Sequence, residues 1–202
     1  MPDREIQYQT IFRSLSKKLR TPKQVQAWLR AMPYNREKGG ETLRSALSAY
    51  HAGTAHCLEA CFLAAAVLES QGYPAQVMSM ESQDDLDHVI FVFKARTGWG
   101  SVARSRDEGL HGREPRFRSL RDLAYSYFDP YVDHSGKVTA YGAANLDDLG
   151  ADWRKSPTNV WKIEKELIDL KHQPLKSSKA RYQKLLANYH AKGPLTSGPG
   201  WW

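Results

Sequence analysis

One stretch, residues 55–75, constrains the fold of this chain more than any other. From residue 58 to residue 68 it is apolar at nearly every position and rich in alanine and leucine, which favour helix. Gly72 and Pro74 follow, and these residue types commonly stand just beyond the last turn of a helix. Because a helix that is apolar all round must be buried on every side, the sequence predicts a central helix with Cys57 at its N-terminal end.

The residues that follow this helix predict a β-sheet. Residues 76–80 could form a first strand. Residues 89–93, directly after His88, are rich in β-branched and aromatic side chains, which favour a buried strand. Gly98 then interrupts the run, and residues 99–105 are expected to return beside the strand that His88 opens.

The register of this hairpin follows from the position of its turn. If the turn is centred midway between Lys94 and Trp99, these two residues pair with each other. The same register places His88 opposite Ser105, and paired residues have Cβ atoms about 5 Å apart. A loop with an odd number of residues would shift this pairing.

Helices are predicted on both sides of the hairpin. Apolar residues recur at helical spacing in six stretches, 4–19, 22–32, 43–50, 120–128, 158–170 and 179–191. The last residues are rich in glycine, proline and serine, which is typical of flexible segments. The sequence therefore predicts one α+β domain over residues 1–175, followed by a basic helical extension and a flexible tail over residues 176–202.

The composition is that of an ordinary soluble domain. The 202 residues are 41% hydrophobic and 25% charged, which suffices for one domain with a sizeable core. The two cysteines, Cys57 and Cys61, are four residues apart and predict no disulfide framework, and without ligands at metal spacing no metal or cofactor is expected. Reduced thiols favour the cytoplasm. The polar first residues and the short apolar runs predict neither a signal peptide nor a membrane span.

Cys57 and His88 are the candidate catalytic pair, with simple packing as the alternative for the cysteine. A thiol attacks only as thiolate, and a helix N-terminus and a neighbouring imidazolium both stabilise that anion. His88 would act as general base and then as general acid, and the N–H of Cys57 would stabilise an oxyanion. Cys61 lies one turn inside the helix and is expected to pack in the core. His56 is expected to point away from the thiol.

The order of these features resembles the transglutaminase-like (papain-like cysteine hydrolase) superfamily: a cysteine opens a buried helix, then a strand headed by histidine and a return strand follow. The segments GTAHCLEACFLAAAVLESQGYPAQVMSM, DDLDHVIFVFK and SRDEGLHGREP are similar to an uncharacterised bacterial family within it, over roughly residues 20–170. The resemblance implies a transglutaminase-like core, with a central buried helix packed on a small antiparallel sheet between N- and C-terminal helices. It also implies a Cys-His-Asp triad that cross-links glutamine to lysine, deamidates, or cleaves amide bonds.

Carried onto this sequence, the resemblance implies that Cys57 is the nucleophile and His88 the base. The chain departs from the pattern at the third position, where the superfamily has aspartate and this sequence has Ser105. Asp107 lies two residues further on and could substitute only if the strand bulges or slips. Serine can orient an imidazole but adds no charge, so a weakened triad, a carboxylate from elsewhere and a fold kept for binding all stay open.

Three further residues are candidates for substrate binding. Tyr34 and Asn35 stand in a loop before the central helix and could reach the rim of the site. Arg113, after the hairpin, could line the cleft or form a surface ion pair. Asp85 and Asp87, in the acidic loop before the second strand, could also line the cleft, although a solvated loop is the default.

Three functions are compatible with these features. The first is a thiol amide hydrolase or acyltransferase that acts on a protein or peptide through a Cys57 thioester. The alternative is a catalytically degenerate peptide- or protein-binding module, which Ser105 at the third position favours. Nucleic-acid binding is a distant third, because the net charge of +7 and the basic segment 171–192 permit it but no nucleic-acid motif accompanies them.

Overall fold

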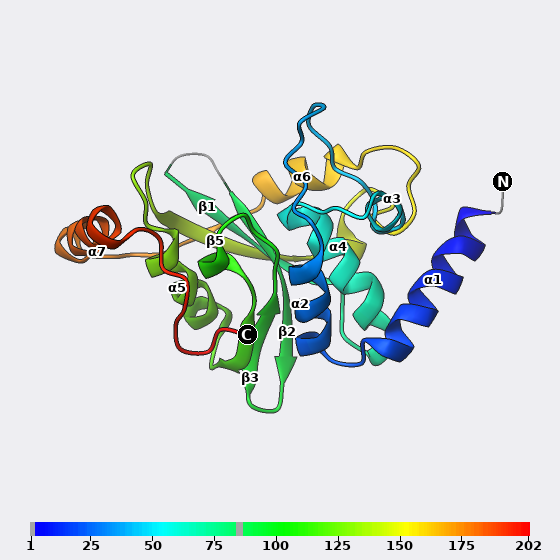
Figure 1. Cartoon of the computed structure of the whole chain (residues 1–202), viewed down its shortest axis with the longest axis horizontal. Helices are drawn as coiled ribbons and strands as arrows, with labels where there is room; N and C mark the ends of the chain where they lie inside the picture. Colours follow the sequence, from blue (N-terminus) through cyan, green and yellow to red (C-terminus); the bar gives the residue numbers. More distant parts are fainter. Residues whose placement is uncertain (1–2, 84–86) are drawn as a thin grey trace.

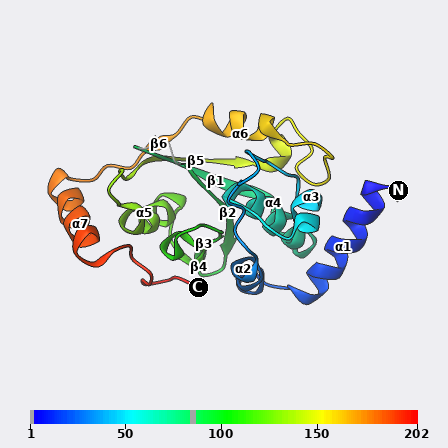
Figure 2. The ribbon, with the colours of Figure 1, turned by 45° about the horizontal axis from the view of Figure 1, so that its top comes forward.

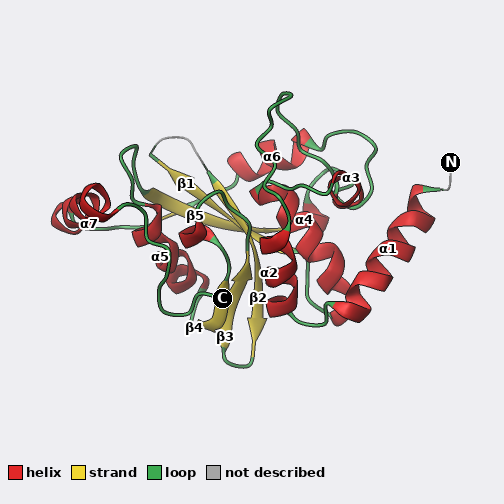
Figure 3. Cartoon of the chain, viewed as in Figure 1, coloured by secondary structure: helices red, strands yellow, loops and turns green. Residues whose placement is uncertain are grey.

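The chain forms a sheet with helices on both of its faces. The computed structural model describes residues 3–83 and 87–202, and within them the chain has seven α-helices and a six-stranded sheet (Figures 1 and 3). The predicted α+β class is confirmed. Asp85 lies outside the described residues. None of the helices in these two ranges is both long enough and apolar enough to cross a bilayer.

All neighbouring strands of the sheet are antiparallel, in the spatial order β4-β3-β2-β1-β5-β6. Their bounds are Gln76–Ser82 for β1, His88–Ala95 for β2, Gly98–Val102 for β3, Arg113–Phe117 for β4, Val138–Asn145 for β5 and Gln173–Pro174 for β6. Side chains alternate between the two faces of a strand. Val77 and Phe91 therefore enter one core, while Met78 and Ile90 enter a second core on the opposite face.

Helix α4 (Cys57–Leu68) is the centre of the first core. Every residue from Leu58 to Leu68 is buried, and the helix packs against β2. Three helices surround it (Figure 2), namely α1 (Arg4–Lys18), α2 (Pro22–Ala31) and α3 (Ala46–Ala52). The predicted central buried helix is confirmed, including its start at Cys57.

Helix α5 (Leu120–Tyr131) covers the opposite face of the sheet. It begins where the Ser119 hydroxyl accepts a hydrogen bond from the Asp122 N–H, at 3.1 Å. Helix α6 (Trp161–Ile168) lies on the side of the molecule where α3 lies, and helix α7 (Lys179–Lys192) lies at the far end of the long axis from α1 (Figure 1). None of the residues of α7 is buried.

The register of the β2–β3 hairpin is partly as predicted. Lys94 pairs with Trp99, which confirms the position of the turn. The ladder stops at the pair formed by Phe91 and Val102, so Ser105 lies beyond the strand rather than opposite a ladder residue. The prediction that the return strand runs to residue 105 is therefore wrong.

A buried glutamine ends the strand early. Gln26 of α2 is 1% exposed, and its amide binds both backbone groups of Ala103. The Ala103 N–H donates to Oε1 at 2.8 Å, and Nε2 donates to the Ala103 carbonyl at 2.9 Å. The side chain thus supplies the hydrogen bonds that a strand partner would supply, and the chain leaves the ladder.

The tail that the composition predicts to be flexible packs against the sheet. Trp201 forms a β-bridge with Arg113 at the start of β4. The indole N–H of Trp202 donates to the carbonyl of Ser101 in β3, at 2.8 Å. The two tryptophans supply the apolar surface that anchors this segment, although the glycine- and proline-rich composition around them predicts flexibility.

We predict that Gln26→Met, which keeps the length of the side chain, destabilises the fold by about 3 kcal/mol or more. The substitution leaves three buried groups without their partner, the N–H and carbonyl of Ala103 and the N–H of Gly112, and each such group costs about 1–3 kcal/mol. Urea unfolding measures the change. Gln9→Met is the matched control, because Gln9 is exposed and bonds only Glu5. Equal unfolding midpoints for the two variants would contradict this reading of Gln26.

Candidate active site

Cys57 opens α4 at the wall of a cleft of about 910 Å³. The residue before it, His56, is extended, with φ −86° and ψ −176°, and its N–H donates to Glu59 Oε2 at 3.2 Å. This contact fixes where the helix begins. The cysteine is half-buried and stands where the unpaired N–H groups of a helix give a positive partial charge.

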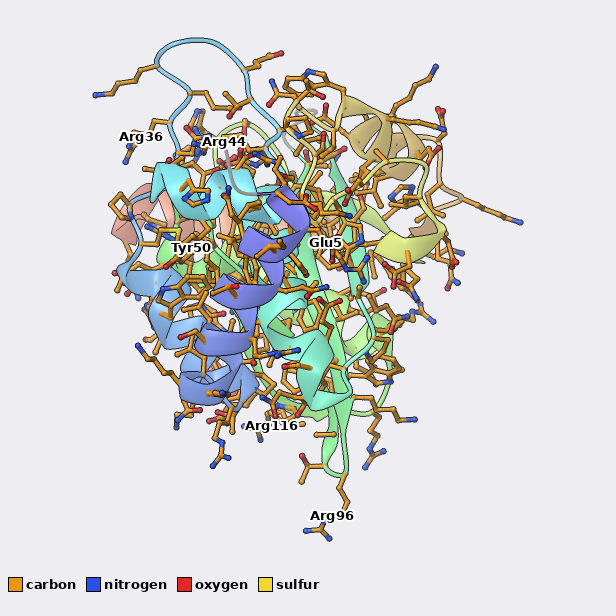
Figure 4. All side chains as sticks on the ribbon, turned by 90° about the vertical axis from the view of Figure 1, so that its right-hand side faces the viewer. Glu5, Arg36, Arg44, Tyr50, Arg96 and Arg116 are labelled. Carbon is orange, nitrogen blue, oxygen red and sulfur yellow. The ribbon has the colours of Figure 1, made fainter. Side chains whose placement is uncertain are left out.

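The cleft lies at the end of the molecule opposite the β2–β3 hairpin. Figure 4 shows Arg36 and Arg44 at one end and Arg96, at the hairpin tip, at the other. Arg36 lines the cleft, and Arg44 binds Glu59 directly behind the start of α4. The site is therefore built where the N-terminal end of α4 and the first residue of β2 meet.

His88 is the first residue of β2, pairs with Met80 of β1 and is 4% exposed. Its Nε2 lies 2.9 Å from the carbonyl oxygen of Leu110. A carbonyl can only accept a hydrogen bond, so Nε2 carries a proton and Nδ1 is left for the thiol. The structure brings Cys57 and His88 together, since both line the cleft and the interaction with His88 lowers the pKa of the thiol.

The surroundings of Cys57 favour the thiolate. Burial raises the pKa of this thiol, but hydrogen bonds and charge from His56 and His88 outweigh burial and hold the pKa well below its ordinary value. Cys61, by contrast, is fully buried one turn further on, and burial raises its pKa well above the ordinary value. The predicted core role of Cys61 is confirmed.

His56 also belongs to the site, and the expectation that it points away from the thiol is wrong. Its imidazole lines the cleft beside Cys57, and its Nε2 lies 2.9 Å from the Thr42 carbonyl oxygen and 3.8 Å from Glu59 Oε1. Burial lowers the pKa of His56, but the thiolate and Glu59 raise it to about 9. The signal in the sequence was Glu59, three residues after His56, because glutamate at this spacing folds back on the residue that caps a helix.

Glu59 is a fully buried carboxylate that organises the back of the site. It forms an ion pair with Arg44, at 2.7 Å, and accepts a hydrogen bond from Asn35 Nδ2 at 3.2 Å. Burial raises the pKa of Glu59, but hydrogen bonds from Arg44 and the charges of His56 and Arg44 together outweigh burial and lower the pKa below its ordinary value. Glu59 is therefore ionised and holds positive charge on His56 beside the thiol.

Ser105 and Asp107 line the cleft, but neither holds the imidazole of His88 in the part of the chain that the structure describes. The Ser105 hydroxyl instead accepts a hydrogen bond from the N–H of Asp107, at 3.2 Å. The sequence offered these two residues as candidates for the third position and also left open a carboxylate from elsewhere or a fold kept for binding. The position is occupied by the main-chain carbonyl of Leu110, because the strand ends early and the chain returns toward His88 through a 3₁₀ turn, Glu108–Leu110.

Tyr34 and Asn35 both line the cleft, where the sequence placed a site rim. Tyr34 forms a parallel β-bridge with Ala55, which holds it beside the start of α4. Burial, and next the charge on Cys57, raise the pKa of the Tyr34 phenol. The side-chain N–H₂ of Asn35 donates to Thr42 Oγ1 at 2.8 Å, so this residue supports the wall rather than facing solvent.

Arg113 does not line the cleft and is not at the surface, so the expectation that it lines the cleft or forms a surface ion pair is wrong. The side chain is fully buried behind the Leu110 turn, and its guanidinium donates to main-chain carbonyls. Asp87, in contrast, lines the cleft.

The outer wall of the cleft is apolar. Trp161 and Ile168 of α6 both line it and are 40% and 61% exposed. They are seven residues apart, so they lie on one face of the helix, and Glu164 lies between them. An extended chain could lie along this wall with a carbonyl over Cys57.

Among the described residues, no three His, Cys, Asp or Glu side chains are grouped as a metal site requires. No protein-family model matches the chain, and no curated protein matches it.

We predict that iodoacetamide alkylates Cys57 with a midpoint well below the ordinary thiol pKa of about 8.5. His56→Gln removes one of the two cations beside the sulfur, so the midpoint should rise toward the ordinary value. Site-resolved mass spectrometry across a pH series measures both midpoints. Exposed His51 provides the matched control, His51→Gln, and buried Cys61 should stay unlabelled in the folded protein. A wild-type midpoint at or above about 8.5 would show that the thiol is not activated.

Proposed function

We propose that this protein is a transglutaminase-like thiol enzyme, an amide hydrolase or acyltransferase that acts on a protein or peptide. Cys57 is its nucleophile and His88 its acid and base. The observation that carries the proposal is that the thiol at the start of α4 and the imidazole of His88 line the same cleft, where His56 and His88 hold the pKa of the thiol low. Perturbed pKa values in a cleft are typical of functional sites.

The order of elements supports a transglutaminase-like core. A cysteine opens the buried helix α4, a histidine opens the next-but-one strand β2, and β3 returns antiparallel to it. The reaction needs no metal or cofactor, because a thiolate and an imidazolium suffice for acyl transfer. A free thiolate is preserved in a reducing compartment, so we place the protein in the cytoplasm.

In the first half-reaction, the Cys57 thiolate attacks the carbonyl carbon of a substrate amide and forms a C–S bond. Negative charge develops on the carbonyl oxygen, and the N–H groups at the start of α4 stabilise it. Protonated His88 then transfers its Nδ1 proton to the amide nitrogen. The C–N bond breaks, ammonia or an amine leaves, and a thioester remains on Cys57.

In the second half-reaction, water or a substrate amine attacks the thioester. Neutral His88 accepts the proton of the nucleophile on Nδ1 while the C–S bond breaks. An acid or a new amide leaves the site, and the thiolate and the imidazolium are restored.

The two histidines have different tasks in this mechanism. His56 is bound by the Thr42 carbonyl and by ionised Glu59, so it keeps its proton and acts as a fixed positive charge. His88 faces a neutral carbonyl, so it can gain and lose a proton during turnover. One imidazole stabilises the anion and the other moves protons.

An activated ester tests this chemistry without knowledge of the natural substrate. With p-nitrophenyl acetate, the wild-type protein should acetylate Cys57 and then release acetate. His88→Asn should accumulate the acetyl-enzyme, because loss of general-base catalysis slows its hydrolysis by about 10²–10⁴-fold. Nitrophenol release and the mass of the Cys57 peptide report the two steps.

His190→Gln is the matched control, because His190 is an exposed residue of α7 and should leave both steps unchanged. Acetylation of wild-type Cys57 no faster than that of free cysteine at the same pH would contradict the proposal.

The second candidate is a peptide- or protein-binding module with a degenerate site. One observation favours it: among the described residues, the hydrogen-bond partner of the His88 imidazole is a neutral carbonyl, which adds no charge to stabilise an imidazolium. A peptide that binds in the cleft, still binds to the Cys57→Ala variant and is never turned over would support this candidate over the enzyme.

A further inference from the structure

The partner of His88 is a main-chain carbonyl, so its position depends on what holds the turn that carries it. Leu110 ends the 3₁₀ turn Glu108–Leu110, and the His111 N–H donates to the Glu108 carbonyl at 3.2 Å. The N–H and C=O of a trans peptide point in opposite directions. The bond from His111 therefore turns the Leu110 carbonyl outward, toward His88.

Arg113 grips this turn on both sides of Leu110. Its Nη2 donates to the Gly109 carbonyl and its Nη1 to the His111 carbonyl, both at 2.6 Å. A third, longer bond reaches the Ser126 carbonyl at 3.3 Å. Because the fork of a guanidinium is rigid, the residues before and after Leu110 are held in one fixed relation.

The cost of burying this arginine argues for a specific role. Arg113 is fully buried, and in the described part of the chain it has no carboxylate partner within ion-pair distance. A buried unpaired charge is expensive, and an apolar residue would fill the same space at lower cost. The carbonyls and two aromatic rings offset the charge. The guanidinium carbon lies 4.1 Å from the centroid of the Tyr127 ring and 4.4 Å from the centroid of the Trp201 ring.

One of these rings belongs to residues 194–202. Trp201 forms an antiparallel β-bridge with Arg113, and the Glu114 N–H donates to the Gly200 carbonyl at 2.8 Å. Arg30 of α2 donates to the carbonyl of Trp202 at 3.0 Å. These contacts lay the tail across the back of the turn.

The turn is also shaped to receive this tail. A Cβ atom at Gly109 would collide with the carbonyl of Leu195, so glycine is required there for the tail to lie this close. A Cβ atom at Gly112 would collide first with Gln26 Oε1 and the Ser101 carbonyl, and then with the ring of Trp202. We call Arg113, Trp201 and the Leu110 turn the clamp.

We propose that Arg113 and Trp201 are positioning residues: the clamp fixes the Leu110 carbonyl and thereby holds His88 in the single tautomer that presents Nδ1 to Cys57. The claim that the clamp supports catalysis rests on the proposed function. The claim that the clamp sets the tautomer of His88 does not, because it concerns only His88 and the groups behind it.

Nitrogen-15 NMR of the histidine rings reads the tautomer directly. At a pH high enough to deprotonate the imidazolium that pairs with the thiolate, His88 of the wild-type protein should be protonated on Nε2 alone. Trp201→Ala removes the outer ring of the clamp, so we expect signals of both tautomers. Trp201→Phe keeps an aromatic face over the guanidinium and should restore the single form.

Turnover of the activated ester supplies the second readout. For Trp201→Ala and for a chain that stops at Pro194, we expect kcat to fall about tenfold while KM changes less than twofold, as for loss of a group that orients a catalytic residue. Leu195→Ala is the control on the same tail, because its side chain is 45% exposed and only its carbonyl meets Gly109.

A single Nε2 tautomer in both Trp201→Ala and the shortened chain would overturn the clamp. A mixed tautomer in the wild-type protein would do the same. A wild-type Cys57 that is no more reactive than free cysteine would instead refute the proposed function, and the tautomer would still report on the clamp.

Discussion

The site depends on one interaction, the stabilisation of a sulfur anion at the start of a buried helix. Burial alone would keep the Cys57 thiol protonated, as it does for Cys61 one turn away. Two imidazoles and the helix end reverse this effect at Cys57. The same apolar helix that forms the core thus begins at a position where a negative charge is favourable.

This arrangement requires buried charge in the layers behind the thiol. Glu59 and Arg44 form an ion pair under the first turn of α4, and Glu59 in turn keeps His56 positive. Arg113 stands behind His88 on the other side, balanced by carbonyls and aromatic faces rather than by a carboxylate. Glu59, Arg44 and Arg113, which do not line the cleft, therefore support the two imidazoles from behind.

The sequence predicted the features that depend on local pattern. The apolar run of α4 and the pairing of Lys94 with Trp99 are local, and both are confirmed. The errors arise from contacts between residues far apart in the chain. Gln26 ends β3 before Ser105, and no pattern near residue 105 contains that information.

The surroundings of Arg113 are also set by a contact from far away in the chain, with the ring of Trp201. A basic residue after a hairpin normally faces solvent, but Arg113 is buried between Tyr127 of α5 and a tryptophan far away in the chain. His56 is an intermediate case, since Glu59 three residues later was a readable signal. The central claim is that the surroundings of Cys57 stabilise its thiolate. It is tested most directly by the ultraviolet absorbance of the thiolate, titrated in the wild-type protein and in Cys57→Ser. The account predicts a difference signal that appears well below pH 8.5, the approximate pKa of an ordinary thiol, and a signal that appears only at or above about that pH would contradict it.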